Sequence, residues 1–549
     1  MRFPNILKLT GLLLSLLLLP AVAEAQFTFV TNNGAIYINT YTGTGGAVVI
    51  PSATNGFSVV GISSAAFSGK STITSVIIPN SVTNIGFNAF ILCKGLTNVV
   101  IGTGVTSIGS EAFDFCQILP SLTIPDNVTV LGSNLCVNCF YLTNVTIGTG
   151  LNSLGSEAFD KCSNLQTIVV AAGNTSYSSL NGVLYDKAQR TLIQCPTKVS
   201  GSFNIPNTVT NIGVLAFDAC SNLTSVTMPS VITIGSSAFS GCNQLPALAF
   251  PGTLISIGDA AFNQCHDLLT VTIPAGVTNI GAGVFGGCFN LTNITVDAGN
   301  LNYSSLAGVL FDKNKTAIIQ FPEGKGGSYV VPNTVQNIGL GTFGLCFNLT
   351  SVTLGSSITN IGDYAFEACY ALTNVTIPNG VTAIGQLAFY TCTNLVSITI
   401  PASVNSIGTF AFFGCSALAS VYFEDDAPTA GYPTVGSGIF DLANPTLYYL
   451  PGRTNWTSTQ TQQAFQSLAL VLWNAQANTG DSLFGVRTNR FGFNISGTAN
   501  IPILVEATTN LAQPSWIPLL TGTLTNGLVY FNDANWKNYP GRFYRIRSP

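Results

Sequence analysis

The sequence predicts a repeat solenoid that is rich in β-strand, with one short parallel strand in each repeat, followed by a small all-β, sandwich-like module. Two observations favour this fold. A motif of the form Gly-x-x-Ala-Phe-x-x-Cys recurs at a nearly fixed period, and a run of alternating apolar residues follows most copies. Fixed periods of about 20 to 50 residues are typical of solenoids, in which each repeat buries its apolar face against its neighbours.

The phenylalanine of the motif marks the period. Successive copies stand 23 residues apart, once 22 apart and twice 58 apart. A less regular first copy ends at Ala66 and Phe67 without its cysteine, and in one later copy cysteine replaces the phenylalanine. The positions are Phe90, Phe113, Cys136, Phe159, Phe217, Phe239, Phe262, Phe285, Phe343, Phe366, Phe389 and Phe412.

Each position of the repeat has a physical role. After the cysteine comes Leu-x-x-Val-x-Ile, whose alternation predicts a short strand with one face inward. Proline follows in many copies and ends the strand where no hydrogen-bond donor is needed. Val-Thr-x-Ile-Gly is a second apolar pair, and we expect its glycine to make a turn. Ala-Phe-x-x-Cys then turns the chain back in a tight segment, which could be helical or 3₁₀, and buries both side chains.

The N-terminus has the pattern of a secretory signal peptide. Arg2 and Lys8 form a basic region, a leucine-rich run follows, and Ala23-Glu24-Ala25 provides a cleavage site. We expect cleavage after Ala25, so that the mature chain is exported and is secreted or held at the cell surface. A retained membrane anchor is disfavoured because the apolar run is short and Pro20 interrupts it. We find no later run of about 20 apolar residues and expect no membrane-spanning segment after cleavage.

The chain divides around the regular repeats. We expect an N-terminal β cap with the first irregular repeat, the solenoid, a C-terminal cap, a linker and a terminal β module. The module has five candidate strands, FGFNIS, IPILVEAT, WIPLL, LVYF and RFYRIR, which favour a small sandwich. The expected boundaries are 1–25 for the signal peptide, then 26–66, 67–420, 421–473, 474–483 and 484–549 in the order given.

The two 58-residue steps carry matched inserts, at about 172–200 and 298–326. AGNTSYSSLNGVLYDKAQRTLIQCP and AGNLNYSSLAGVLFDKNKTAIIQFP share Gly-Val-Leu-Tyr/Phe-Asp, a polar turn and an apolar run, which predicts a β-hairpin that projects from the coil. They also hold much of the scarce charge. Each insert could be a tolerated loop or a second contact surface, and the sequence leaves both open.

These repeats resemble the BspA-like, Treponema-type class of leucine-rich repeat, whose hallmark is Leu-x-x-Val-x-Ile-Pro followed by Ile-Gly-x-x-Ala-Phe-x-x-Cys. The resemblance covers roughly residues 27–450. It implies a leucine-rich-repeat coil, and an exported bacterial surface protein that mediates adhesion or binding. The terminal module resembles the β modules appended to large exported bacterial proteins, and our leading hypothesis gives it a role in attachment or display.

Twelve of the 14 cysteines occupy the repeat position. Stacked neighbours about 5 Å apart could form disulfides by distance, but equivalent side chains in a stack point the same way. We therefore favour a structural ladder of buried thiols over disulfides, and we expect no metal site. The ladder comprises Cys93, Cys116, Cys139, Cys162, Cys220, Cys242, Cys265, Cys288, Cys346, Cys369, Cys392 and Cys415.

The sequence offers little for catalysis, and we expect no enzyme, no catalytic residue and no cofactor. His266, the one histidine, stands where other repeats accept many residue types, and no nucleophile motif accompanies it. The acidic run Glu424-Asp425-Asp426 is more typical of a solvated turn than of a carboxylate pair. Only 7% of residues are charged, and the net charge is −4, which excludes a basic nucleic-acid-binding surface.

The strand face is the better candidate for binding. Between the core positions it displays hydroxyl and amide side chains in two columns, which stacking would turn into an extended neutral surface. The alternative is that threonine is there for β propensity alone. Few aromatic residues interleave on this face, which favours a protein or a mixed polymer as ligand over a sugar-stacking groove. The candidate residues are Thr123, Asn144, Thr146, Thr227, Thr272, Asn293, Thr295, Thr353, Asn374, Thr376 and Thr399.

Three functions remain open. The first is adhesion or protein–protein interaction at the cell surface, with an extracellular or cell-surface protein as partner. The second is a structural spacer or self-assembling envelope or matrix protein, which near-identical repeats of low charge would suit. The third and most remote is ice binding, because regular threonine columns could order water.

Overall fold

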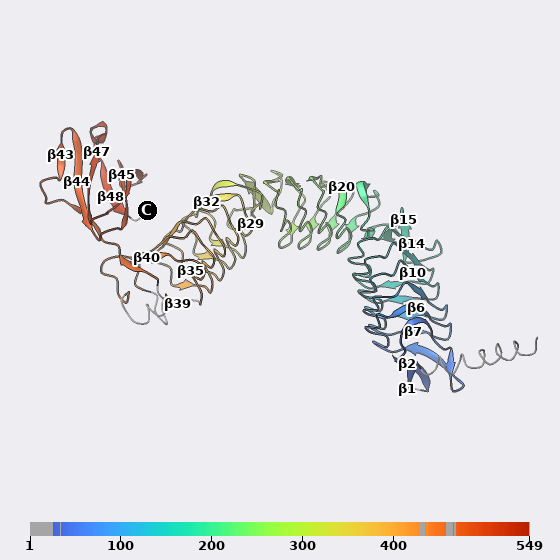
Figure 1. Ribbon diagram of the computed structural model, residues 1–549. Helices are drawn as coiled ribbons and strands as arrows, with labels where there is room; N and C mark the ends of the chain where they lie inside the picture. The colour runs from blue at the N-terminus through green and yellow to red at the C-terminus, as the bar shows by residue number, and fades with distance from the viewer. Residues whose placement is uncertain are drawn as a thin grey trace, which may run out of the picture. The chain divides into compact units, whose positions relative to one another are not determined.

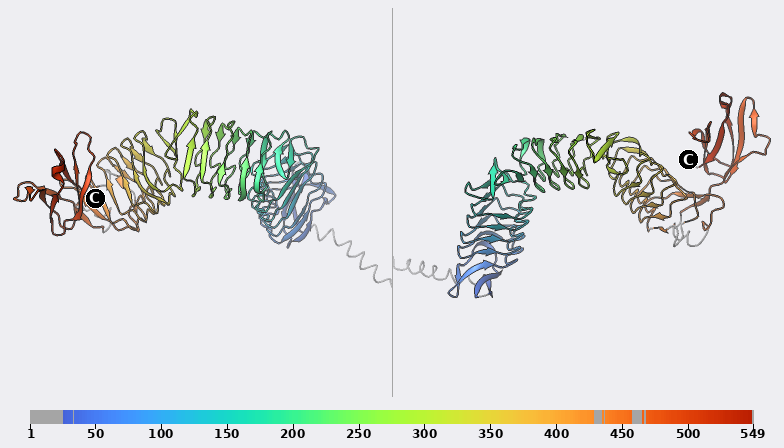
Figure 2. Two further views of the ribbon diagram at one scale, coloured as in Figure 1. Left: turned by 90° about the horizontal axis from the view of Figure 1, so that it is seen from above. Right: turned by 180° about the vertical axis from the view of Figure 1, so that it is seen from behind.

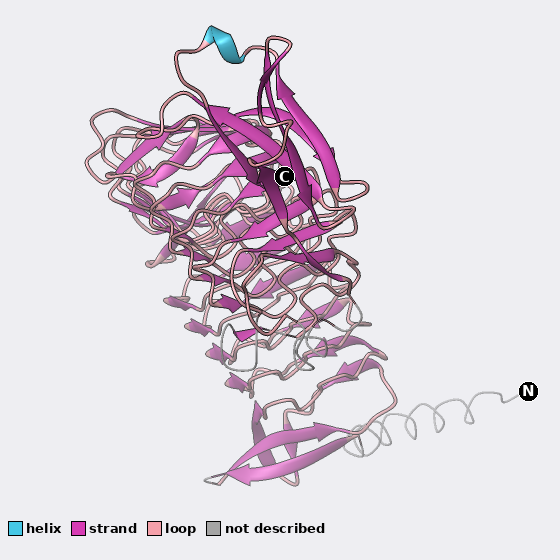
Figure 3. Cartoon of the chain, turned by 90° about the vertical axis from the view of Figure 1, so that its left-hand side faces the viewer, coloured by secondary structure: helices cyan, strands magenta, loops and turns pink. Residues whose placement is uncertain are grey.

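A computed structural model describes residues 26–32, 34–427, 434–435, 437–456, 465 and 468–547 (Figure 1). The predicted signal peptide lies outside these residues. The structure divides into two units, one ending at Lys313 and one beginning at Asn314, and each is described by itself. Strands and turns build both units, and among the described residues the helical structure is one 3₁₀ turn, η1 (Trp536–Asn538), drawn in cyan in Figure 3. No helix in this described part is long and apolar enough to cross a membrane.

Unit 1 begins with an antiparallel pair, β1 (Phe27–Asn32) and β2 (Ala35–Tyr41), and β2 then pairs in parallel with β5 (Phe57–Ile62). A two-residue strand, β4 (Ala53–Thr54), also pairs with β5. The rings of Phe27 and Tyr41 lie 5.5 Å apart, and Tyr41 stacks on Phe67 at 5.3 Å. Aromatic side chains therefore cover the open end of the repeat core.

Each regular repeat contributes two parallel strands, where the sequence predicts one. The longer strand comes from Leu-x-x-Val-x-Ile, and a two-residue strand comes from the second apolar pair. In unit 1 the longer strands form the ladders β3 (Gly46–Val49), β6 (Ile73–Ile77), β8 (Asn98–Val100); β10 (Ser121–Ile124), β12 (Asn144–Ile147), β14 (Thr167–Val170); β18 (Ser200–Asn204), β20 (Asn222–Thr227); and β22 (Ala247–Leu248), β24 (Thr270–Ile273), β26 (Asn293–Val296). Figure 2 shows them stacked side by side.

The two-residue strands of unit 1 form a second set of ladders, which the first insert interrupts. They are β7 (Asn84–Ile85), β9 (Ser107–Ile108), β11 (Val130–Leu131) and β13 (Ser153–Leu154) before the insert, and β19 (Asn211–Ile212), β21 (Thr233–Ile234), β23 (Ser256–Ile257) and β25 (Asn279–Ile280) after it. The Ala-Phe-x-x-Cys segments that follow are hydrogen-bonded turns and not helices.

The repeated phenylalanine and cysteine build the core. The rings of Phe90 and Phe113 stack at 5.3 Å with their planes 3° apart, and Phe217 stacks on Phe239 at 4.7 Å. All 14 cysteines are buried thiols. A thiol of the ladder donates a hydrogen bond to a carbonyl of the preceding repeat, as Cys116 does to Phe90 at 3.3 Å. The Phe90 carbonyl also accepts the N–H of Cys93 at 3.2 Å, so the buried thiol uses the second acceptor site of that oxygen.

The first insert lies inside the coil, and its central strand does not project as a hairpin. It contains three antiparallel strands, β15 (Tyr177–Leu180), β16 (Val183–Asp186) and β17 (Thr191–Gln194). Leu184 belongs to the apolar cluster before the insert, whereas Val183 and Tyr185 belong to the cluster after it. Strand β16 is therefore a buried partition between two cores. In the second insert, β27 (Tyr303–Leu306) pairs with β28 (Val309–Asp312) in the same way.

Unit 2 repeats the pattern. Its second ladder is β31 (Asn337–Ile338), β33 (Asn360–Ile361), β35 (Ala383–Ile384), β37 (Ser406–Ile407) and β39 (Thr434–Val435), and β29 (Ile318–Gln320) precedes these repeats. The rings of Phe343, Phe366, Phe389 and Phe412 stack at 4.9, 4.9 and 5.0 Å. The longer strands are β30 (Gly327–Val330), β32 (Leu349–Thr353), β34 (Asn374–Thr376), β36 (Ser397–Ile400), β38 (Ser420–Phe423), β40 (Thr446–Tyr449) and β41 (Leu470–Leu472).

The terminal module has two antiparallel sheets around one core. One contains β42 (Ala475–Asn478), β43 (Gly485–Arg487), β44 (Arg490–Gly497) and β47 (Leu528–Asp533), and the other β45 (Pro502–Thr508), β46 (Ile517–Thr523) and β48 (Phe543–Arg547). The linker predicted at 474–483 is wrong in part, because residues 475–478 pair with β44 as β42. Alternating Ala-Gln-Ala-Asn carries too little apolar signal to predict a strand.

Candidate binding surface on the strand face

The predicted candidate residues lie on the outward face of the longer strands. Ser121 pairs with Asn144 and Thr123 with Thr146, so equivalent residues of neighbouring repeats stand side by side. Asn293 and Thr399 are half-buried, and the other nine candidates are exposed. The same register brings Thr272 beside Thr295 in unit 1 and Thr353 beside Thr376 in unit 2.

The columns are divided into short ladders, where the sequence predicts one extended surface. Pro120 and Pro246 explain two of the breaks, between β8 and β10 and between β20 and β22. Most other repeats place a residue with an N–H group there, and Thr143 donates this hydrogen to Pro120 O at 2.9 Å. Proline has no backbone N–H, so it cannot extend the ladder backwards.

Hydroxyl groups hydrogen-bond to one another along the columns. Thr272 Oγ1 and Thr295 Oγ1 lie 2.8 Å apart, and Ser351 Oγ donates to Ser328 Oγ at 2.8 Å. Thr227 Oγ1 donates to Asn204 Oδ1 at 2.8 Å. Serine, threonine and asparagine are uncharged, so the surface is neutral and less strongly hydrated than a charged one. The side chains meet part of each other's hydrogen-bonding capacity, which orders them along the column.

The same column becomes apolar at the N-terminal end of unit 1. Val49 pairs with Ile77 and Ile77 with Val100, and these side chains are 58%, 43% and 47% exposed. We call this row the apolar strip. The sequence prediction does not include this row, because it took polar residues as the mark of a binding column, although the three residues occupy the repeat position of Thr123. Exposed apolar rows beside polar groups are typical of interaction surfaces.

In unit 2 the corresponding column is covered at its C-terminal end. Thr399 pairs with Tyr422, and Tyr422 pairs with Tyr448. The two rings stack at 4.9 Å and are 5% and 9% exposed, because they belong to the core of the terminal module. The accessible strand face of unit 2 therefore ends near Thr399.

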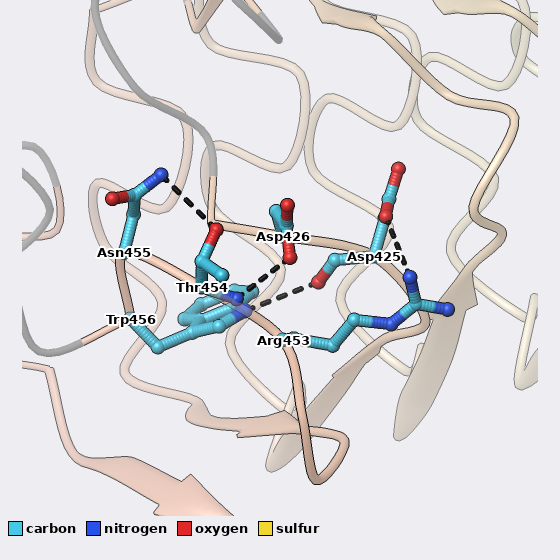
Figure 4. Close-up of polar contacts among 6 residues, drawn as sticks. All are labelled: Asp425, Asp426, Arg453, Thr454, Asn455 and Trp456. Atoms are coloured by element: carbon cyan, nitrogen blue, oxygen red, sulfur yellow. Dashed lines mark hydrogen bonds and ion pairs between the residues drawn. The ribbon is translucent and has the colours of Figure 1, made fainter.

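The acidic run at 424–426 fastens the C-terminal cap (Figure 4). Asp425 Oδ1 lies 3.0 Å from Arg453 Nη1, and the carbonyl oxygen of Asp425 accepts a hydrogen bond from Trp456 Nε1 at 3.1 Å. Asp426 Oδ1 accepts one from the Thr454 N–H at 2.6 Å. This backbone hydrogen bond lowers the pKa of Asp426. Asp425 and Asp426 therefore serve structural contacts within the cap.

Other titratable residues also have structural partners. The ring of His266 stacks on that of Phe289 at 5.4 Å. The carboxyls of Asp160 and Asp218 lie close together across the first insert. Because the insert separates the two residues in the sequence, their proximity was not predicted. Burial, followed by the charge of Asp160, raises the pKa of Asp218 to about 6. Among the described residues, no group of three His, Cys, Asp or Glu side chains could hold a metal ion.

The repeats match the family model of the BspA-type leucine-rich repeat region, in six copies over residues 60–180, 196–315 and 321–433. These ranges make up more than half of the chain. The chain belongs to the BspA-type leucine-rich repeat family. This confirms the resemblance drawn from the Ile-Gly-x-x-Ala-Phe-x-x-Cys motif.

Solved structures similar to this BspA-type protein include a leucine-rich cell surface protein from Faecalibacterium prausnitzii A2-165, with 25% identity, a TM-score of 0.41, and coverage of 80% of this chain and 96% of that one. The pneumococcal vaccine antigen PcpA has 17% identity, a TM-score of 0.33, and coverage of 82% and 96%. A leucine-rich repeat protein of T. pallidum has 22% identity, a TM-score of 0.28, and coverage of 49% and 89%. No curated protein matches the chain.

Proposed function

We propose that this BspA-type protein is a non-enzymatic, exported protein that binds an extracellular or cell-surface protein through its strand face. The observation that carries the proposal is the apolar strip beside the hydroxyl columns in unit 1. An apolar row exposed next to neutral hydrogen-bonding groups matches the composition of protein interfaces. Charged groups, which would favour nucleic acid or an ionic polymer, are scarce, at 7% of the chain.

A double variant tests the site. Ile77→Asp with Val100→Asp places two charges on the apolar strip, on side chains that are already 43% and 47% exposed. Val130→Asp is the matched control, because Val130 is 41% exposed on the second ladder of the same unit. The protein is immobilised, incubated with cell-surface and extracellular proteins, cross-linked, and the captured partner is identified by mass spectrometry.

We expect one partner to be captured by the wild type and by the control, and lost by the double variant with an unchanged melting temperature. Equal capture by all three proteins would overturn the strand-face assignment. Ordered arrays of purified protein in electron micrographs, with no partner, would favour the structural spacer. Thermal hysteresis in a dilute sample would favour ice binding.

Export is tested on the full chain. Expression in a bacterial host followed by mass spectrometry of the fractionated cells and medium should yield a mature N-terminus at Gln26. Retention of Met1 in the cytoplasmic fraction would contradict both the export and the cell-surface location.

A further inference from the structure

The turn face of unit 2 carries an aromatic groove that the strand-face proposal does not use. The groove encloses about 430 Å³, and every side chain lining it is half-exposed. The lining residues are Tyr364, Glu367, Leu387, Tyr390, Phe410 and Phe413. They come from three successive repeats, so the groove runs along the stack of turns.

Three of these residues occupy a backbone position that disfavours large side chains. Tyr364, Leu387 and Phe410 have φ values of 55°, 55° and 56°. Their N–H groups bond to the next repeat, as Phe410 N does to Ser437 O at 3.0 Å, which holds this conformation. The left-handed region is unfavourable for bulky L-residues and is usually occupied by glycine or asparagine. The equivalent positions in unit 1 hold no aromatic residue: Asn88, Glu111, Asn134, Glu157, Leu215, Ser237, Ala260 and Gly283.

The rings are held in a fixed arrangement. Tyr390 stacks on Phe413 at 5.2 Å with their planes 14° apart, and Phe410 meets Phe413 edge-on at 5.5 Å and 88°. Gly438 leaves space for the ring of Phe410, since a Cβ at position 438 would lie 2.3 Å from Phe410 Cε1. A groove with preset rings loses little entropy when it binds a flat group.

The surrounding charge has one sign. Glu367, Tyr390 and Phe413 occupy the same repeat position, directly after the core phenylalanine, and Asp441 occupies it in the next turn. Carboxylates therefore stand before and after the two stacked rings in this column. Between residues 326 and 452 the sequence contains no lysine, arginine or histidine and six acidic residues: Asp363, Glu367, Glu424, Asp425, Asp426 and Asp441. A cationic group is the complement of such a groove.

We propose that this groove binds arginine side chains of a basic segment on a partner protein. A planar guanidinium stacks on aromatic rings and donates paired hydrogen bonds to carboxylates, whereas a lysine ammonium is a strongly hydrated point charge. In the groove a guanidinium lies against Tyr390 and Phe413 and donates to Glu367, and a second arginine of the segment reaches Asp441. This surface is separate from the strand face, so either assignment can fail without the other.

The test measures binding of a fluorescein-labelled peptide with three arginines spaced by glycine, by fluorescence polarisation with the full mature chain. A peptide with citrulline in place of arginine has the same shape without the charge. The main variant is Tyr390→Ser with Phe413→Asn, because Ser240 and Asn263 occupy the same repeat position in unit 1. Glu367→Gln is a second variant that keeps the rings, and Ile91→Ser at the same position in unit 1 is the control.

We expect the arginine peptide to bind, and the main variant and the citrulline peptide each to weaken binding about tenfold or more. Glu367→Gln should weaken it by a smaller factor, the control should not, and added salt should reduce the affinity. The proposal would be overturned if the arginine peptide does not bind, or if the citrulline peptide binds as tightly as the arginine peptide. It would also be overturned if both groove variants bind the arginine peptide as tightly as the wild type. Glycan binding that depends on Tyr390 and Phe413, without arginine binding, would also overturn it and assign the rings to a sugar.

Discussion

The indole Nε1 of Trp473 donates a hydrogen bond to the carbonyl oxygen of Pro502 at 2.8 Å. Trp473 directly follows the last strand of the solenoid ladder, β41, and Pro502 begins β45 of the terminal module. Both sides contribute to one apolar core, which includes Tyr448 and Phe493. The terminal module therefore packs on the end of the solenoid and does not hang from a free linker.

Replacing Trp473 by alanine should release the module. The change removes a side chain that is 7% exposed and leaves the Pro502 carbonyl without its donor. Loss of a large buried aromatic residue typically costs about 3–5 kcal/mol. We expect rapid proteolytic cleavage between residues 474 and 484 and an early unfolding transition in guanidinium. Trp516→Ala is the control, since Trp516 is partly exposed and contacts Arg545 at the surface. Equal protease resistance of the two variants would show that the module is held elsewhere.

The cysteine ladder should be chemically inert in the folded protein. Burial raises the pKa of Cys93 and of Cys369 to about 12, and Cys265 Sγ donates its hydrogen to Phe239 O at 3.2 Å. Only the thiolate reacts with alkylating agents, so a neutral, buried thiol is protected. We expect iodoacetamide at pH 8 to modify none of the 14 cysteines in the native protein and all of them after unfolding in guanidinium. Intact mass spectrometry counts the additions. Cysteines that react after unfolding only if a reductant is added would identify disulfides instead.

The sequence predicts the structural features that recur with the repeat period. Phe366 and Cys369 recur because every turn must fill the same core, and the Leu-x-x-Val-x-Ile alternation predicts the longer strands, so the fold class and the strand-face columns follow from the period alone. The apolar strip of Val49, Ile77 and Val100 was missed for a different reason. Ile77 and Val100 stand 46 and 23 residues before Thr123, so the period places them in the same column, but the prediction considered only polar residues. Val49 lies 28 residues before Ile77, and only the strand register places it in this row.

Features that depend on contacts between distant turns could not be predicted. The apolar run of β16 is typical of a hairpin that covers one face, and nothing in it shows that Leu184 and Tyr185 enter two different cores. The proximity of Asp160 and Asp218 depends on the path of that insert. The glycine of Ile-Gly was expected to make a turn, but Gly132 has no positive φ, and its role is close approach between neighbouring turns.

Substitution of Gly132 by alanine should therefore be destabilising. A Cβ at this position would lie 2.2 Å from the backbone nitrogen of Ser110 in the preceding repeat, so one turn must move away from the other. Overpacking of this kind typically costs about 1–3 kcal/mol. Gly252→Ala is the matched control, because a Cβ there meets nothing within 4 Å. Urea denaturation followed by circular dichroism should show a lower midpoint for Gly132→Ala alone. Equal midpoints would mean that the two neighbouring turns accommodate a Cβ at position 132 without moving apart.

The carboxyl pair across the first insert should make stability depend on pH. Burial and the nearby charge of Asp160 raise the pKa of Asp218 from 3.8 to about 6, so the folded state keeps a proton that the unfolded chain has already lost. The favourable contribution is therefore complete below about pH 4 and is lost as the pH rises through about 6. Asp426 acts in a different range, because its lowered pKa matters only below its ordinary value of 3.8.

Asp218→Asn should remove this dependence. The variant keeps the size of the side chain without the charge, so it should be more stable than the wild type at pH 7.5, by roughly 1 kcal/mol since Asp218 is partly exposed and screened. At pH 4.0 the two proteins should have nearly equal urea midpoints. Asp267→Asn, on an exposed residue of the same unit, is the control and should follow the wild-type profile. The difference between variant and wild type isolates Asp218 from other carboxyls, such as Asp114, whose pKa burial also raises. Parallel profiles for Asp218→Asn and wild type would mean that the folded state does not raise the pKa of Asp218.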